Sequence, residues 1–364
     1  MVAIMFDCNA DICDFHNDEV TLNSKQQSEM RDRRNANRNR LKKGLKKNND
    51  PSPDSHQAQG SYAMHTMVQD VDNDYDIDDG VIFLKDDLTG SQGADKSALD
   101  ARKMVCSALD NGSFSTPPQV LKNCVRVFYK QGYHVDVPVY RQLEGGALEL
   151  ASSDWKGSSP SEVTEWFNDA VCDKSPDGRN GRQLRRITKL IKGYKNSRQS
   201  WKARMASGFS ISALVVECYI SDDRDDVALY ETMKSIRDRL KWDLEVAHPV
   251  RSEMLTSGPY DARTKFLQEK LSDALNDLDI LFESDCTRLK ALKAWNCVFQ
   301  HQFWSDHIAD EEAREKERSK QEKASLLREG NSGLAIAAGL TAAVAGISIA
   351  CAKQTQSYGG KKYW

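Results

Sequence analysis

The chain has 364 residues, of which 39% are apolar and 29% are charged, and its formal net charge is −3. At about 150 residues per domain this length allows roughly two domains with a sizeable core, and the composition excludes an integral protein with several membrane spans. The near-neutral charge excludes a uniformly basic nucleic-acid coat, so local clusters carry the information on function. The nine cysteines form no C-x-x-C pair and the N-terminus has no signal-peptide pattern, which predicts a cytoplasmic chain with reduced thiols.

Residues 1–58 are predicted to form a basic helix followed by a polar loop. The run 31–47 contains nine Lys or Arg residues and one Asp, and the Pro, Asn, Asp and Ser residues of 48–59 favour turns. Two interpretations of the basic run stay open. It is a solvated helix face, or it is a surface that attracts phosphate-bearing ligands.

A domain of mixed sheet and helix is predicted for residues 59–155. Short apolar runs at 81–84, 125–129 and 134–140 indicate strands, and residues 97–109 have a helical pattern. Residues 156–310 are predicted to form a helical domain, with helices at 160–171, 182–196, 210–220, 226–240 and 262–281. The predicted fold class is therefore α+β, a sheet domain joined to a helical domain.

The last segment, residues 311–364, is predicted to be a charged helix or linker followed by an apolar tail. Residues 333–352 form a 20-residue run without charge, which is long enough to cross a bilayer. Small residues dominate this run, however, so its insertion would be weak. A C-terminal membrane anchor and a flexible or protein-packed tail both remain open.

The aspartates of residues 68–80 are the densest functional signal. Six of them lie between Asp70 and Asp79, and in a strand Asp76 and Asp78 would project from one face. Asp136 lies in the apolar run 134–140. If the two strands are neighbours, three carboxylates converge, which suits two Mg²⁺ or Mn²⁺ ions and phosphoryl transfer. A D-x-D motif alone is also typical of a calcium-like loop or an acidic turn.

Upstream of the aspartates, Gly60 and Ser61 add a phosphate-binding feature. A glycine lets the chain approach a triphosphate closely, and backbone N–H groups with the Ser61 hydroxyl can bind phosphate oxygens. A Gly-Ser pair alone is only a loop in most proteins. The ordered set of Gly-Ser, Asp-x-Asp and a distant Asp is more specific.

This set resembles the nucleotidyltransferases of the DNA polymerase β type. More narrowly, it is similar to bacterial cyclic-oligonucleotide synthases of anti-phage signalling systems, in the cyclic GMP-AMP synthase branch. The resemblance covers residues 59–220 and rests on QGSY at 59–62 with Thr66, YDIDDG at 75–80, CVR at 124–126, HVDVPVY at 134–140, EWFND at 165–169 and the run 185–212.

The resemblance implies roles for ten residues. Asp76, Asp78 and Asp136 would bind two Mg²⁺ ions, with Mn²⁺ as a substitute, and Asp136 would help to deprotonate the attacking 3′-hydroxyl. The nucleotide-binding set would be Gln59, Gly60, Ser61, Tyr62, Arg126, Lys192 and Ser210. An alternative for Arg126 is an exposed strand charge.

Three features depart from the family pattern. Residues 205–208, before FSIS, are MASG in place of a turn that contains proline. The usual Lys-Ala-Trp is here Lys192-Gly193-Tyr194, and Met64 stands where some relatives carry an aromatic residue that could stack on a base. These departures bear on the base selectivity.

The resemblance also implies an activity and partners. ATP and GTP would be joined into 3′,3′-cyclic GMP-AMP or a related cyclic dinucleotide, which would activate an effector protein in anti-phage defence. No stable nucleic-acid partner is expected, and Gly359-Gly360 suggests a ubiquitin-transfer-like partner at the C-terminus. Two other readings remain open: an enzyme of this fold that nucleotidylates RNA or protein, and a non-catalytic adaptor that acts through its tail.

Overall fold

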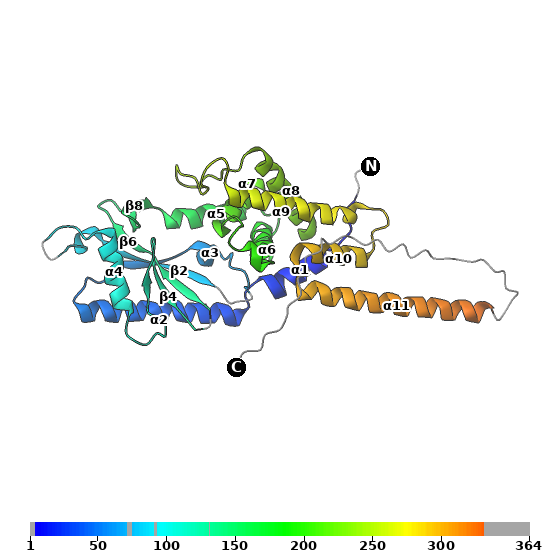
Figure 1. Cartoon of the computed structure of the whole chain (residues 1–364), viewed down its shortest axis with the longest axis horizontal. Helices are drawn as coiled ribbons and strands as arrows, with labels where there is room; N and C mark the ends of the chain where they lie inside the picture. Colours follow the sequence, from blue (N-terminus) through cyan, green and yellow to red (C-terminus); the bar gives the residue numbers. More distant parts are fainter. Residues whose placement is uncertain (1–3, 71–74, 91–92, 131, 331–364) are drawn as a thin grey trace.

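The computed structural model describes residues 4–70, 75–90, 93–130 and 132–330. Within these ranges the chain forms a sheet half and a helical half, as Figure 1 shows. The predicted α+β class is therefore confirmed. Aspartates 72 and 74, the uncharged run 333–352 and Gly359-Gly360 lie outside the described residues.

The sheet half contains one mixed eight-stranded sheet with β2 at its centre. β1 pairs with one edge of β2 in antiparallel orientation, while β5 and β6 pair with β2 in parallel orientation. Its strands are β1 (Ser55–Gln59), β2 (Asp76–Leu84), β3 (Gln119–Val120), β4 (Val125–Phe128), β5 (His134–Val137), β6 (Val139–Gln142), β7 (Leu148–Ala151) and β8 (Trp155–Ser158).

β5 and β6 continue one another along β2. Both keep the same register offset against β2 and are separated only by Pro138. Proline has no N–H to donate to a ladder, but its carbonyl accepts a hydrogen bond of 2.9 Å from the backbone N–H of Val81. The apolar run 134–140 is therefore a single strand path with one proline interruption.

The polar stretch 48–59 is only partly a loop, which corrects the sequence-based prediction. Residues 55–59 form β1 because β2 offers them a hydrogen-bonding edge, with Ser55 opposite Ile82 and Gln59 opposite Asp78. Composition did not indicate this strand, since its residues are polar and lie at the edge of the sheet.

Two helices, α2 (Ser24–Asn48) and α4 (Ala98–Leu109), cover the face of the sheet that carries Ile77, Val81 and Phe83. The helices touch closely at Gly44, where an added Cβ would lie 1.8 Å from the carbonyl oxygen of Ala108. In Figure 1 α2 runs along the lower side of the sheet.

Several arginines of the basic run in α2 have partners inside the molecule. Arg38 donates to Asp79 at 2.8 Å through Nε, and the guanidinium of Arg33 lies 4.3 Å from the centre of the Tyr133 ring. These arginines therefore stabilise the packing of α2 on the sheet. The run as a whole is more than a solvated face.

The helical half is built around a second core of buried side chains. The N-terminal helix α1 (Asn9–Phe15) packs here and not beside α2, with the Phe15 ring 4.7 Å from that of Phe299 and Asp11 paired to Arg288 at 2.7 Å. The other helices of this half are α5 (Pro160–Lys174), α6 (Gln183–Asn196), α7 (Gly208–Cys218), α8 (Asp225–Trp242), α9 (Ala262–Leu278), α10 (Arg288–Phe299) and α11 (Gln302–Gly330).

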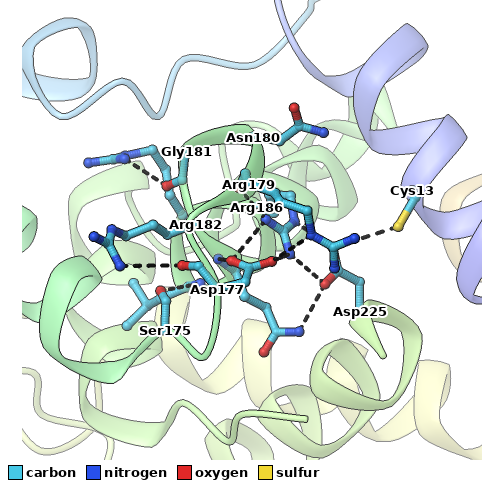
Figure 2. A network of polar contacts seen from close by, with 12 residues as sticks. Cys13, Ser175, Asp177, Arg179, Asn180, Gly181, Arg182, Arg186 and Asp225 are labelled. Atoms are coloured by element: carbon cyan, nitrogen blue, oxygen red, sulfur yellow. Dashed lines mark hydrogen bonds and ion pairs between the residues drawn. The ribbon is translucent and has the colours of Figure 1, made fainter. Parts of the chain in front are cut away.

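A buried ionic network fixes the first turn of α6 (Figure 2). Arg186 donates to Asp225 through Nε at 2.6 Å and to Asp177 through Nη2 at 2.8 Å, and Gln183 donates to Asp225 at 2.9 Å. Burial alone would raise the pKa of Asp225, but the hydrogen bonds from Arg186 and Gln183 outweigh it and lower the pKa. The network holds α6 against α8, and α6 carries Lys192.

The last described helix, α11, extends away from the body of the molecule in Figure 1. Near its start Glu311 is paired to Arg318 at 3.0 Å. Within the described part of the chain, no helix has both the length and the apolar character that a bilayer crossing would need.

Candidate active site

β2 and β5 bring the three predicted aspartates to one end of the sheet. In their parallel register Asp78 lies directly opposite Asp136. The alternation of the strands sends Ile77 and Val135 into the core, where both are fully buried, so Asp76, Asp78 and Asp136 share the other face. The structure thus brings together residues that lie up to 60 positions apart in the sequence.

Arg126 lies between two of these carboxylates. It sits on β4 opposite Asp136 and donates to both oxygens of that carboxylate, at 2.7 and 2.8 Å. Its Nη2 is also 3.3 Å from Asp76. The hydrogen bonds to Asp136 raise the pKa of Arg126, so this guanidinium is a fixed positive charge inside the site.

One guanidinium does not compensate three carboxylates. Burial, then the charges of Asp136 and Asp76, raise the pKa of Asp78 to about 7, against a smaller opposite effect of Arg126. Among the described residues no three acidic, His or Cys side chains form a preformed metal cage. The donor set nevertheless fits a divalent cation, because it consists of hard carboxylate oxygens whose mutual repulsion an added cation would relieve.

The Gly-Ser segment lies directly against this cluster. Gly60 opens the short helix α3 (Gly60–Ala63) with a φ of +62°, and a Cβ at this position would lie 2.2 Å from Oδ2 of Asp78. A side chain here would displace the carboxylate, so glycine is required on grounds of both space and conformation.

Gln59 precedes this segment and is held by a buried tyrosine. The hydroxyl of Tyr140 donates to Oε1 of Gln59 at 3.0 Å. Gly80 leaves room for both groups, since a Cβ there would lie 2.8 Å from the Tyr140 ring and 3.1 Å from that amide oxygen. With Oε1 engaged, the Nε2 group of Gln59 remains the donor available to a ligand.

A cavity of about 220 Å³ opens between the two halves at this point. Its wall includes Ser61 and Asp76 from the sheet half and Lys192 and Lys195 from α6. The Nζ of Lys192 is buried and donates to Oγ1 of Thr66 at 2.8 Å. Burial, with the charges of Lys195 and Lys189, lowers the pKa of Lys192 to about 7.

Of the seven predicted nucleotide-binding residues, Ser61 and Lys192 line this cavity. Gln59, Gly60 and Arg126 lie beside the carboxylates, and Tyr62 and Ser210 line other cavities. Tyr62 lines a separate cavity of about 460 Å³, and its hydroxyl accepts a hydrogen bond of 3.3 Å from Arg34. Ser210 lines a third cavity, of about 320 Å³, where its hydroxyl lies 2.8 Å from that of Ser207. Gly208, at the start of α7 and two residues before Ser210, lines the cavity of 220 Å³.

Two of the departures from the family pattern, Met64 and Gly193, have structural explanations. Met64 is buried in the core of the helical half, so it does not offer a surface for base stacking. Gly193 packs against Val20 of the N-terminal segment, where a Cβ would lie 3.3 Å from a Val20 methyl group. An alanine at this position of α6 would therefore require Val20 to move by a few tenths of an ångström.

Sequence reasoning missed two residues of the site, Tyr140 and Lys195. Both follow from periodicity: Tyr140 is four residues after Asp136 in the same strand path, and Lys195 is three residues after Lys192 in the same helix.

Comparison with known proteins agrees with this geometry. Residues 55–140 match the family model described as cyclic GMP-AMP synthase DncV-like, nucleotidyltransferase domain. This segment of the sheet half is therefore similar to the DncV-like nucleotidyltransferase domain. The resemblance found in the sequence is confirmed for this segment, which includes all three aspartates and the Gly-Ser pair.

Solved DncV structures share the fold over both halves. Vibrio cholerae DncV, a cyclic AMP-GMP synthase in complex with nonhydrolyzable GTP, matches with a TM-score of 0.60 and 17% identity, covering 77% of this chain and 91% of that one. Its complex with the linear intermediate 5′ pppA(3′,5′)pG matches with a TM-score of 0.61 and 16% identity, covering 81% of this chain and 96% of that one. Escherichia coli DncV bound to 3′-deoxy GTP matches with a TM-score of 0.60 and 16% identity, covering 77% of this chain and 92% of that one. At these identities the likeness is one of fold.

Proposed function

We propose that this protein joins two nucleoside triphosphates into a cyclic dinucleotide, first as a linear dinucleotide and then, after repositioning, as the closed ring. The observation that carries the proposal is the placement of Asp76, Asp78 and Asp136 beside Gly60 and Ser61 within a DncV-like domain. The similar Vibrio cholerae DncV is a cyclic AMP-GMP synthase that has been solved with a linear intermediate, which supports ATP and GTP as substrates.

In each transfer, a 3′-oxygen attacks the α-phosphorus of a donor triphosphate and the bond to pyrophosphate breaks. The proton of the attacking hydroxyl goes to Asp136. Arg126 holds both oxygens of this carboxylate, so its orientation is fixed before the nucleotide arrives. Such preorganisation lowers the barrier because no reorientation is needed during the reaction.

Two Mg²⁺ ions would be held by Asp76, Asp78 and Asp136, with Mn²⁺ as a substitute. When bound, such ions supply Lewis acidity at the phosphate and the attacking oxygen. The chain itself contributes the close approach at Gly60, the Ser61 hydroxyl and the oriented amide of Gln59, which together are suited to hold the phosphate chain of the donor. The product would activate a cyclic-nucleotide-binding effector, as the resemblance implies.

The decisive experiment is product analysis with purified protein, Mg²⁺ and the four nucleoside triphosphates, supplied singly and in pairs. We expect a phosphatase-resistant dinucleotide, most abundant with ATP and GTP, and we expect EDTA to abolish it. Asp76→Asn and Asp136→Asn serve as inactive controls. Incorporation of label into RNA or protein, without a soluble cyclic product, would instead favour a transferase acting on a macromolecule. The absence of both kinds of product would favour a non-catalytic adaptor.

A further inference from the structure

The charged groups on the wall of the 220 Å³ cavity are unequally partnered. Asp76 is paired with Arg126 at 3.3 Å, and Asp70 is paired with Lys202 at 2.8 Å. Lys192 donates to Thr66. Each of these three lining residues therefore already has a partner within the described part of the chain.

Lys195 is the exception on this wall. It lies one turn after Lys192 on α6 and lines the same cavity. Within the described residues its ammonium makes neither a hydrogen bond nor an ion pair. Asp70 is the carboxylate whose charge acts on it, but that carboxylate is held by Lys202.

The surroundings of Lys195 also disfavour the charged form of its side chain when no anion is present. Burial lowers the pKa of this lysine, and the positive charges of Lys202 and Arg263 act in the same direction. A polyanion in the cavity would reverse this balance, since it would meet the ammonium groups of Lys192 and Lys195 at once. Lysine suits such a ligand, because its compact charge sits on a long flexible stem with three donors.

We propose that Lys195 is a second phosphate-binding cation of this site, which binds the β- and γ-phosphates of the donor and then the departing pyrophosphate. The inference rests on the proposed function and deepens it. Lys192 donates to Thr66 and so connects the segment after Gly60 and Ser61 to α6, whereas Lys195 is free to pair with the ligand. As the bond to the α-phosphorus breaks, negative charge grows on the pyrophosphate, and Lys195 stabilises that charge.

The test is calorimetric titration of the full chain with ATP, AMP and inorganic tripolyphosphate in the presence of Mg²⁺. In Lys195→Met we expect the affinity for ATP and tripolyphosphate to fall by roughly 10- to 100-fold, with that for AMP unchanged. Lys195→Arg keeps the charge and should recover most of the affinity. Lys241→Met, which removes an exposed lysine of α8 that is paired with Asp238, should bind ATP as the unmodified protein does.

Three outcomes separate this inference from the proposed function. If Lys195→Met binds ATP like the unmodified protein, or loses ATP and AMP equally, the role of Lys195 is wrong even where the protein makes a cyclic product. If the triphosphate-specific loss is seen but the unmodified protein makes no dinucleotide, the phosphate site stands and the proposed reaction is wrong. If the unmodified protein binds neither ATP nor tripolyphosphate, both are wrong.

Discussion

Two carboxylates, one in each half of the molecule, have pKa values shifted in opposite directions. In the helical half, Asp225 accepts hydrogen bonds from Arg186 and Gln183, and these lower its pKa in spite of burial. In the sheet half, Asp78 lies under Gly60 beside two further carboxylates, and its pKa rises to about 7. The same residue type is stabilised in one place and left uncompensated in the other.

The difference separates structural from functional use of buried charge. A buried carboxylate with matched donors fixes the position of helices, and removing one partner is costly. A carboxylate cluster without matched cations destabilises the chain by itself, and such sites mark places where a ligand completes the charge balance. Asp79 sharpens the contrast, since it follows Asp78 directly in β2 but points to the other face and pairs with Arg38.

The largest effect is expected from Asp78→Asn, which should reduce nucleotide transfer by roughly a thousandfold or more. The amide would remove the charge that the metal site needs while leaving the strand intact. The matched control is Asp79→Asn, one residue away on the opposite face, which should retain transfer while losing stability. Similar activity losses in both variants would show that the two faces do not differ as described.

The next effect concerns folding. Asp225→Asn should lower the free energy of unfolding by about 3 kcal/mol, because Arg186 would lose a buried ionic partner. Denaturant titration followed by circular dichroism measures this change. The control is Glu217→Gln, which removes the half-exposed partner of Arg239 and should cost about 0.5 kcal/mol or less. Equal losses in the two variants would contradict the structural role of the network.

Asp78→Asn should also stabilise the metal-free protein. The pKa of Asp78 is about 7 in the folded chain, whereas its ordinary value, which applies to the unfolded chain, is 3.8. The folded state therefore favours the protonated form of this carboxyl group. That preference contributes fully below about pH 4 and is lost as the pH rises through 7. The melting temperature of Asp78→Asn should therefore exceed that of the unmodified protein at pH 8, by roughly 2–4 °C per kcal/mol of repulsion removed.

Scanning calorimetry in EDTA between pH 5 and 8 measures this difference. The difference in melting temperature between Asp78→Asn and the unmodified protein should increase as the pH rises. Excess Mg²⁺ should reduce this difference, because it stabilises the unmodified protein alone. A difference that stays constant with pH would mean that the repulsion among the three carboxylates is not its source.

The smallest effect is expected from Tyr140→Phe, which removes the donor that orients Gln59. Burial raises the pKa of Tyr140 to about 12, so its hydroxyl stays protonated and donates at all working pH values. Without it the Gln59 amide can rotate, and KM for the donor nucleotide should rise by about 3- to 10-fold with little change in kcat. A fall in kcat alone would point to general loosening of the strand.

The local features of the site could be predicted from the sequence. Alternation along β2 and β5 placed Asp76, Asp78 and Asp136 on faces opposite their apolar neighbours, and the helical period of residues 182–196 predicted α6. These predictions succeed because side-chain direction in a strand or helix depends on local geometry alone.

Tertiary packing decided what the local pattern could not. Only the register of β2 with β5 sets Asp78 opposite Asp136, and only the pairing with β2 turns the polar residues 55–59 into a strand. The positions of Tyr62 and Ser210 in other cavities, and of α1 within the helical half, likewise depend on contacts between segments far apart in sequence. Such contacts depend on which surfaces fit together and which charges are compensated. The period of the apolar residues within one segment does not predict them, because it reflects only the local geometry of that segment.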